Sequence, residues 1–168
     1  SETNANDIVK WEFTAEDDSY PQLSDGSYVG GGLDVWLDPN GDPVKDLGYA
    51  MSLPTIAMSN AEDSGEKKWM AAFGNGFNST AGIAKMFVMF LDDGYDGFDY
   101  STGDYVKIST DRGVNNPPDQ RAGYPNGLGS VTLVDIDLNG TADRGYAGDQ
   151  LGNLYRFDIS DTDPANWD

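Results

Sequence analysis

Hydrophobic and polar residues alternate along much of this chain in short runs. The alternation is clear in residues 9–13 and returns in residues 154–157. A period of two residues is the spacing of a half-buried β-strand. Gly, Asn, Asp and Pro separate the runs, as they do at turns. The pattern therefore predicts an all-β protein.

Eight segments carry this strand pattern and are rich in β-branched and aromatic residues. No stretch of the chain shows the apolar stripe of an amphipathic helix. The predicted strands are Ile8–Thr14, Leu53–Ser59, Trp69–Gly74, Lys85–Leu91, Tyr105–Ser109, Ser130–Asp135, Gly145–Gly148 and Asn153–Ile159.

An internal repeat relates the middle of the chain to its end. Each unit has an apolar strand, a strand that ends in Gly-Asn or Gly-Asp, and an aromatic strand. The paired segments are Pro54–Ala57 with Val131–Val134, Ala72–Asn75 with Tyr146–Asp149, and Lys85–Met89 with Asn153–Phe157.

Units of three or four strands that repeat with different loops are typical of propeller blades. We therefore predict a partial β-propeller of three- to four-stranded antiparallel blades with long loops. Residues 1–168 would form a single propeller fragment of about two full blades plus parts of neighbours. The remaining blades would come from a longer chain or another subunit, because a blade must stack on its neighbours. A two-sheet sandwich with a coincidental repeat stays open as an alternative.

The segment 135–143 places polar side chains at every second position around a central Gly140. These side chains are Asp135, Asp137, Asn139, Thr141 and Asp143. They match positions 1, 3, 5, 7 and 9 of a calcium loop, and Gly140 takes position 6, where a sharp turn needs a residue without a Cβ. Thr141 would contribute its backbone carbonyl. An all-oxygen ligand set favours calcium over zinc or copper.

The loop departs from an EF-hand at position 12, where Tyr146 replaces the bidentate Glu and a strand follows instead of a helix. We therefore expect a dissociation constant of about 10⁻⁴ to 10⁻³ M, as in extracellular modules. A metal-free turn rich in Asp and Asn is the alternative.

Charge and composition narrow the possible partners. The chain has 29 acidic and 10 basic residues, a formal net charge of −19, which disfavours nucleic acid and anionic membrane surfaces and favours a cation. It contains no His and no Cys, so a Ser-His-Asp triad, a thiolate metal site and disulfides are excluded. No apolar run is long enough to span a membrane. No signal peptide is visible at Ser1, and we expect the chain to be a piece of something longer.

The region around the acidic loop resembles the C-terminal propeller of the PilY/PilC-type type IV pilus adhesins. After the loop, that family carries Tyr-Ala-Gly-Asp, then Gly-Asn-Leu and an aromatic-Arg-Phe-Asp strand. The matching segments here are Tyr146–Asp149, Gly152–Leu154 and Tyr155–Asp158, with Trp11–Thr14, Asp46–Tyr49, Pro54–Ile56 and Phe73–Ser79 upstream.

This resemblance implies a location at a pilus tip or cell surface, with pilin subunits or a host or cell-surface receptor as partners. It also implies that calcium in the loop modulates pilus assembly, retraction or adhesion. The positions that carry over are Asp135, Asp137, Asn139, Thr141 and Asp143. Residues 16–47 exceed the family's spacing and are interpreted as a loop insertion. The resemblance does not extend to the family's N-terminal adhesive region.

Two other functions stay open. An integrin-like (FG-GAP) propeller would use the same loop for purely structural calcium. A quinoprotein-type enzyme or a glycosidase is less favoured, because no carboxylate pair can be placed at catalytic spacing and the cofactor-stacking tryptophan repeat is missing. We expect no enzyme, and expect the tryptophans to fill blade cores. They are Trp11, Trp36, Trp69 and Trp167.

Overall fold

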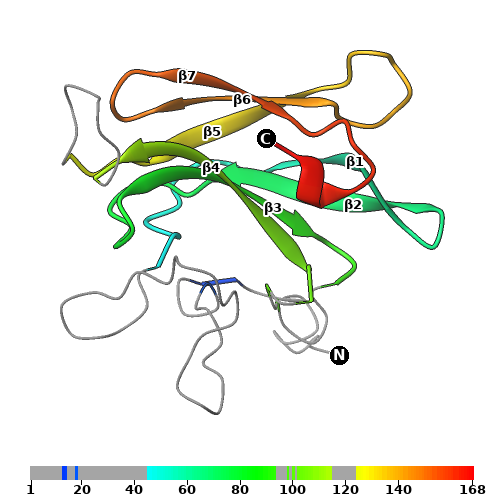
Figure 1. The fold of residues 1–168 in the computed structure, drawn as a ribbon, viewed down its shortest axis with the longest axis horizontal. Helices are drawn as coiled ribbons and strands as arrows, with labels where there is room; N and C mark the ends of the chain where they lie inside the picture. The colour runs from blue at the N-terminus through cyan, green and yellow to red at the C-terminus, as the bar shows by residue number, and fades with distance from the viewer. Residues whose placement is uncertain are drawn as a thin grey trace, which may run out of the picture.

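The computed structural model describes residues 13–14, 18, 45–93, 98, 100, 102–114 and 124–168. Within these ranges the chain forms two antiparallel sheets, one lying across a face of the other (Figure 1). No helix in the described ranges is long and apolar enough to cross a membrane. The first sheet has the strand order β1 (Thr55–Asp63), β2 (Glu66–Gly74), β3 (Ile83–Phe90), β4 (Tyr105–Gly113). The second has the order β5 (Leu128–Val134), β6 (Arg144–Asp149), β7 (Leu154–Asp158), and a 3₁₀ turn at Pro164–Asn166 follows it.

The prediction of an all-β chain with units of three and four antiparallel strands is confirmed. The predicted strand at 8–14 lies outside the described residues except for Phe13 and Thr14. The first hairpin is longer than predicted, because β1 continues past Ser59 to Asp63. Ser64 and Gly65 both have positive φ, 53° and 86°, and connect β1 to β2 in a two-residue turn whose twist suits a hairpin.

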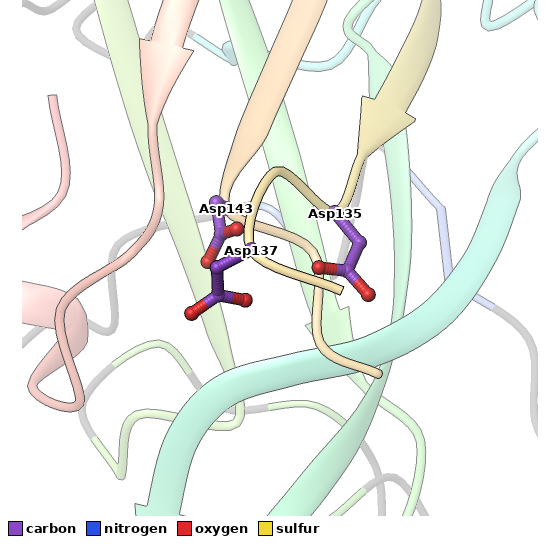
Figure 2. A group of neighbouring side chains, drawn as sticks. All are labelled: Asp135, Asp137 and Asp143. Carbon is purple, nitrogen blue, oxygen red and sulfur yellow. The ribbon is translucent and has the colours of Figure 1, made fainter. Parts of the chain in front are cut away.

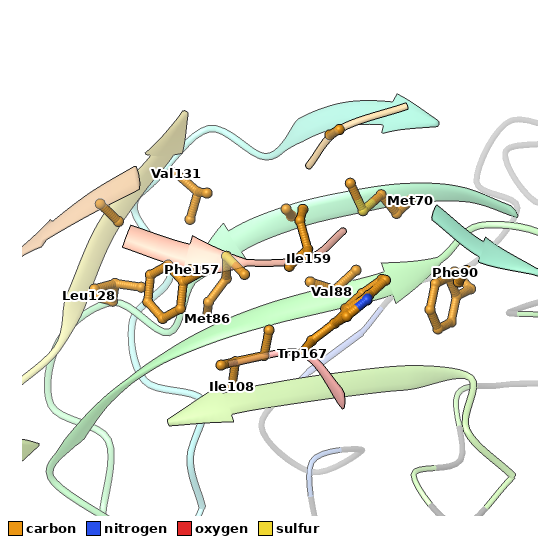
Figure 3. Packing of buried hydrophobic residues seen from close by; sticks show 14 of the residues in the cluster. Met70, Met86, Val88, Phe90, Ile108, Leu128, Val131, Phe157, Ile159 and Trp167 are labelled. Carbon is orange, nitrogen blue, oxygen red and sulfur yellow. The ribbon is translucent and has the colours of Figure 1, made fainter. Parts of the chain in front are cut away.

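The main hydrophobic core lies between the two sheets (Figure 3). It forms because alternate residues of each strand face the other sheet. Complete burial of one such side chain contributes about 1.5–3 kcal/mol, so the packing of the two sheets stabilises both. Core residues with almost no exposure include Met70, Met86, Val88, Leu128, Val131, Phe157 and Ile159.

The opposite face of the first sheet carries a smaller aromatic cluster. Phe87 stacks on Phe73 with ring centroids 5.6 Å apart, and Phe13 meets Tyr105 edge-on at 5.0 Å. Leu47 is buried in the same cluster. Phe13 and Leu47, which precede β1 in the chain, therefore pack against this face.

A buried ion-pair group ties Asp18 and Asp46 to the first sheet. Lys107 Nζ lies 3.1 Å from Asp18 Oδ1 and 2.9 Å from Asp46 Oδ2, and Lys85 Nζ lies 2.6 Å from Asp46 Oδ1. The predicted insertion at 16–47 stays a prediction, because the structure describes only Asp18 and residues 45–47 of this interval.

The expectation that tryptophans fill blade cores holds for Trp167, which is buried. It is wrong for Trp69, which is 48% exposed. Met70, the next residue of β2, faces the second sheet, so Trp69 points to the opposite face. Trp11 and Trp36 lie outside the described residues.

Candidate metal centre

The acidic segment 135–143 is the connection between β5 and β6. Val134 pairs with Arg144 at the base of the loop, and the Asp143 N–H donates to the Val134 carbonyl at 2.9 Å. Two residues within the loop have positive φ, Leu138 at 62° and Gly140 at 95°. This conformation is unfavourable for a leucine, so other contacts must hold the loop in its curled shape.

The Asp135 carboxylate supplies those contacts. Its Oδ1 accepts hydrogen bonds from the backbone N–H groups of Leu138 at 2.7 Å and Asn139 at 3.3 Å, and its Oδ2 accepts one from Gly140 at 2.8 Å. A short acidic side chain that binds the amides following it stabilises a turn. Asp135 therefore organises the curl around one point.

Asp135, Asp137 and Asp143 come together at this loop (Figure 2). Each offers one carboxylate oxygen, and these oxygens lie within 4.8 Å of one another. Oxygens on opposite sides of a calcium ion are about 5 Å apart, because each bond is about 2.3–2.6 Å long. The carboxylate set therefore fits one hard cation. In the described part of the chain, no other group of three acidic residues has this spacing.

Asn139 and Thr141, the other two predicted ligands, connect the acidic group to the base of the loop. The Asn139 amide nitrogen donates to Asp137 Oδ2 at 3.1 Å. Asn139 Oδ1 accepts from the Thr141 N–H at 2.8 Å and lies 2.5 Å from the Thr141 hydroxyl. Thr141 is buried and Asn139 is exposed. The prediction that both provide ligand oxygens stays a prediction.

Asp143 is the buried member of the acidic group. Burial by itself raises the pKa of this carboxyl, but hydrogen bonds reverse the effect, and the pKa lies below its usual value. The Ile136 N–H donates to Asp143 Oδ2 at 2.8 Å, and the Asn60 amide donates to Oδ1 at 3.0 Å. The folded loop therefore keeps Asp143 in the charged form that a cation requires.

Asn60 is a residue of this site that the sequence did not reveal. It belongs to β1 of the other sheet, far from the loop along the chain, and it is buried. The available signal was weak: Ser59 and Asn60 place two polar residues in a row within a strand whose other inward residues are apolar.

Comparison with known proteins identifies the family. The family model described as the PilY1 β-propeller domain matches residues 14–168. The chain belongs to the PilY1 β-propeller family. The prediction of a propeller of this type is therefore confirmed, and the sandwich alternative is set aside.

Individual PilY1 proteins agree with this assignment. A type IV pilus biogenesis factor PilY1 homolog of Xylella fastidiosa is 35% identical over 137 residues, which is 79% of this chain. The type IV pilus biogenesis factor PilY1 of Pseudomonas aeruginosa is 35% identical over 118 residues, which is 70% of this chain. In both cases the match spans 8% of the relative's own length.

A solved structure also matches. The crystal structure of the Pseudomonas aeruginosa PilY1 C-terminal domain has a TM-score of 0.51 and 33% sequence identity. The match covers 68% of this chain and 19% of that chain.

Proposed function

We propose that the loop 135–143 binds calcium and that this chain is a calcium-binding propeller module of a type IV pilus-associated surface protein. The observation that supports calcium most directly is the set of three carboxylate oxygens within 4.8 Å on one curled loop. The association with pili is supported by the PilY1 relatives, which are named type IV pilus biogenesis factors.

Calcium would supply the positive charge that offsets the repulsion among the three carboxylates. The side chains of the loop then determine its conformation and which residues it exposes to solvent. Asp135 fixes the curl through the loop amides, and Asp143 fixes the junction with β6. Ile136 and Leu138 alternate with the acidic residues and are 57% and 86% exposed.

An ordered loop would hold Ile136 and Leu138 as an apolar contact surface for a pilin subunit or a host or cell-surface receptor. An exposed apolar pair on a rigid loop loses less conformational entropy on binding than one on a mobile loop. Calcium would in this way modulate pilus assembly, retraction or adhesion at the cell surface. The role is one of binding and not of catalysis.

Calorimetric titration tests the calcium site. We expect the 168-residue chain to bind calcium with a dissociation constant of about 10⁻⁴ to 10⁻³ M. Asp137→Asn should weaken calcium binding strongly, because it removes one of the three carboxylates of the acidic group. Asp137 is exposed, so the substitution leaves the buried contacts of the loop intact. Glu66→Gln removes one exposed carboxylate at the start of β2 that is not part of the acidic group, and should bind calcium as the wild type does. Equal calcium affinities for the wild type, Asp137→Asn and Glu66→Gln would contradict the proposed site.

A structural role, as in integrin-like propellers, is the second candidate, because Asn60 ties the loop to the buried core. The Asp137→Asn substitution in the full-length protein separates the two roles. A folded variant with altered pilus extension or retraction supports modulation. A variant whose only defect is lower thermal stability supports a purely structural ion.

A further inference from the structure

Asn60 extends out of its own sheet into the base of the acidic loop. Its side chain is 5% exposed and forms hydrogen bonds with both its nitrogen and its oxygen. The amide nitrogen, which has two N–H donors, lies 3.0 Å from the Ala142 carbonyl oxygen, 3.0 Å from Asp143 Oδ1 and 3.3 Å from the Ile159 carbonyl oxygen. Its Oδ1 accepts from the Thr141 hydroxyl at 2.7 Å. The sheet β1–β4 is the first blade and the sheet β5–β7 is the second. One side chain of the first blade therefore contacts both the acidic loop and Ile159, directly after β7 of the second blade.

A β-bulge in β1 directs Asn60 to this position. Met58 pairs with Trp69, but the next pair is Glu62 with Lys67, so β1 advances four residues while β2 advances two. A bulge turns a side chain out of the regular alternation and is often found beside a functional site. The Met58 carbonyl, at the start of the bulge, accepts the Ala142 N–H at 2.9 Å.

The Thr141 hydroxyl connects Asn60 to a predicted ligand. It lies 2.7 Å from Asn60 Oδ1 and 2.5 Å from Asn139 Oδ1. A hydroxyl has one proton and donates one strong hydrogen bond at a time, so these two oxygens compete for it. If Asn139 Oδ1 is engaged by a cation, the hydroxyl is left to donate to Asn60, and the contact between the blades is strengthened.

We propose that Asn60 is a positioning residue that couples the cation site at 135–143 to the β1–β2 hairpin of the preceding blade. The inference rests on the proposed calcium site and adds where the effect of binding is transmitted. Coupling of this kind is reciprocal: if Asn60 strengthens cation binding, cation binding must strengthen the contact between the blades by the same factor.

Two measurements on the 168-residue chain test this coupling. Calorimetry should show that Asn60→Ala weakens calcium binding by about 10- to 100-fold, the usual effect of removing a hydrogen-bond partner of a metal ligand. Ser59→Ala is the matched control, because Ser59 is a buried polar residue of the same bulge whose hydroxyl donates to Lys68 in its own sheet. It should bind calcium as the wild type does.

Hydrogen exchange on the wild-type chain gives an independent readout that does not require a folded variant. Calcium should slow exchange of the β1–β2 hairpin amides, as well as those of the loop itself. Unchanged hairpin exchange in a wild type that binds calcium, or equal calcium affinity in Asn60→Ala, would overturn the coupling while leaving the site intact. A wild type that takes up no calcium would overturn both.

Discussion

Asn75, directly after β2, and Asp149, the last residue of β6, form the same pair of hydrogen bonds with a residue in or next to the strand that follows. The Asn75 N–H donates to the Lys85 carbonyl at 2.9 Å, and Asn75 Oδ1 accepts from the Lys85 N–H at 3.1 Å. The Asp149 N–H donates to the Asn153 carbonyl at 3.0 Å, and Asp149 Oδ1 accepts from the Asn153 N–H at 2.7 Å. The sequence repeat is therefore also a repeat of hydrogen bonding.

Asp149 should make the stability of the chain depend on acid pH. Burial raises the pKa of this carboxyl, but hydrogen bonds from Asn126, Asn153 and Tyr155 outweigh burial and hold the pKa below the usual 3.8. The stability that Asp149 contributes is thus present above pH 3.8 and lost as pH falls through the lowered pKa. Asp149→Asn should cost about 1–3 kcal/mol at neutral pH.

Urea unfolding at a series of pH values measures this effect. The difference between wild type and Asp149→Asn should shrink at acid pH, because protonation removes the charge that the variant already lacks. A difference that stays constant over the whole acid range would show that the Asp149 charge contributes nothing.

Tyr155 should have the opposite dependence, at alkaline pH. Burial first, and the hydrogen bond to Asp149 second, raise the pKa of its hydroxyl from 10.0 to about 12. A raised pKa favours the neutral phenol in the folded state, so this contribution is complete below pH 10.0 and is lost as pH rises toward about 12. In Tyr155→Phe the unfolding free energy should fall less steeply over this interval. Identical slopes in wild type and variant would refute the assignment.

Gly74 and Gly148 take equivalent places in the repeat, but their surroundings differ. A Cβ on Gly74 would lie 2.1 Å from the Gly129 carbonyl oxygen of the next sheet, whereas a Cβ on Gly148 meets its nearest atom at 3.6 Å. Gly74→Ala should therefore destabilise the chain by about 1–3 kcal/mol or more, because backbone must move. Gly148→Ala should change the unfolding free energy much less. Thermal unfolding of the two variants checks this, and equal losses would contradict the close packing at Gly74.

Phe157 and Leu154 test the core between the sheets within one strand. Phe157 is buried against the first sheet, while Leu154 is largely exposed on the other face of β7. Phe157→Ala should cost about 3–5 kcal/mol. Leu154→Ala should stay within about 0.5 kcal/mol of the wild type. Denaturant titration measures both, and similar losses would mean that the two sheets are not packed through this face.

Strand positions were predictable from the sequence because alternation and turn residues are local signals. The segments predicted at 85–91 and 105–109 overlap β3 and β4, and the acidic loop falls between β5 and β6 as its spacing indicated. The role of Asn60 was not predictable, because it depends on a β-bulge and on the packing of two sheets. Neither leaves a periodic trace in a single sequence.

The position of Trp69 also could not be predicted from the sequence. Its size suggested a core position, but the face of a strand residue is set by the register of the whole strand. The alternation that buries Met70 against the second sheet leaves Trp69 half exposed.

A crystal structure of the chain grown in millimolar calcium, with an anomalous-scattering map, tests the calcium site most directly. The proposal predicts one anomalous peak enclosed by the carboxylates of Asp135, Asp137 and Asp143, which already lie within 4.8 Å of one another. An ordered loop with no peak, or with these carboxylates turned toward solvent, would contradict it.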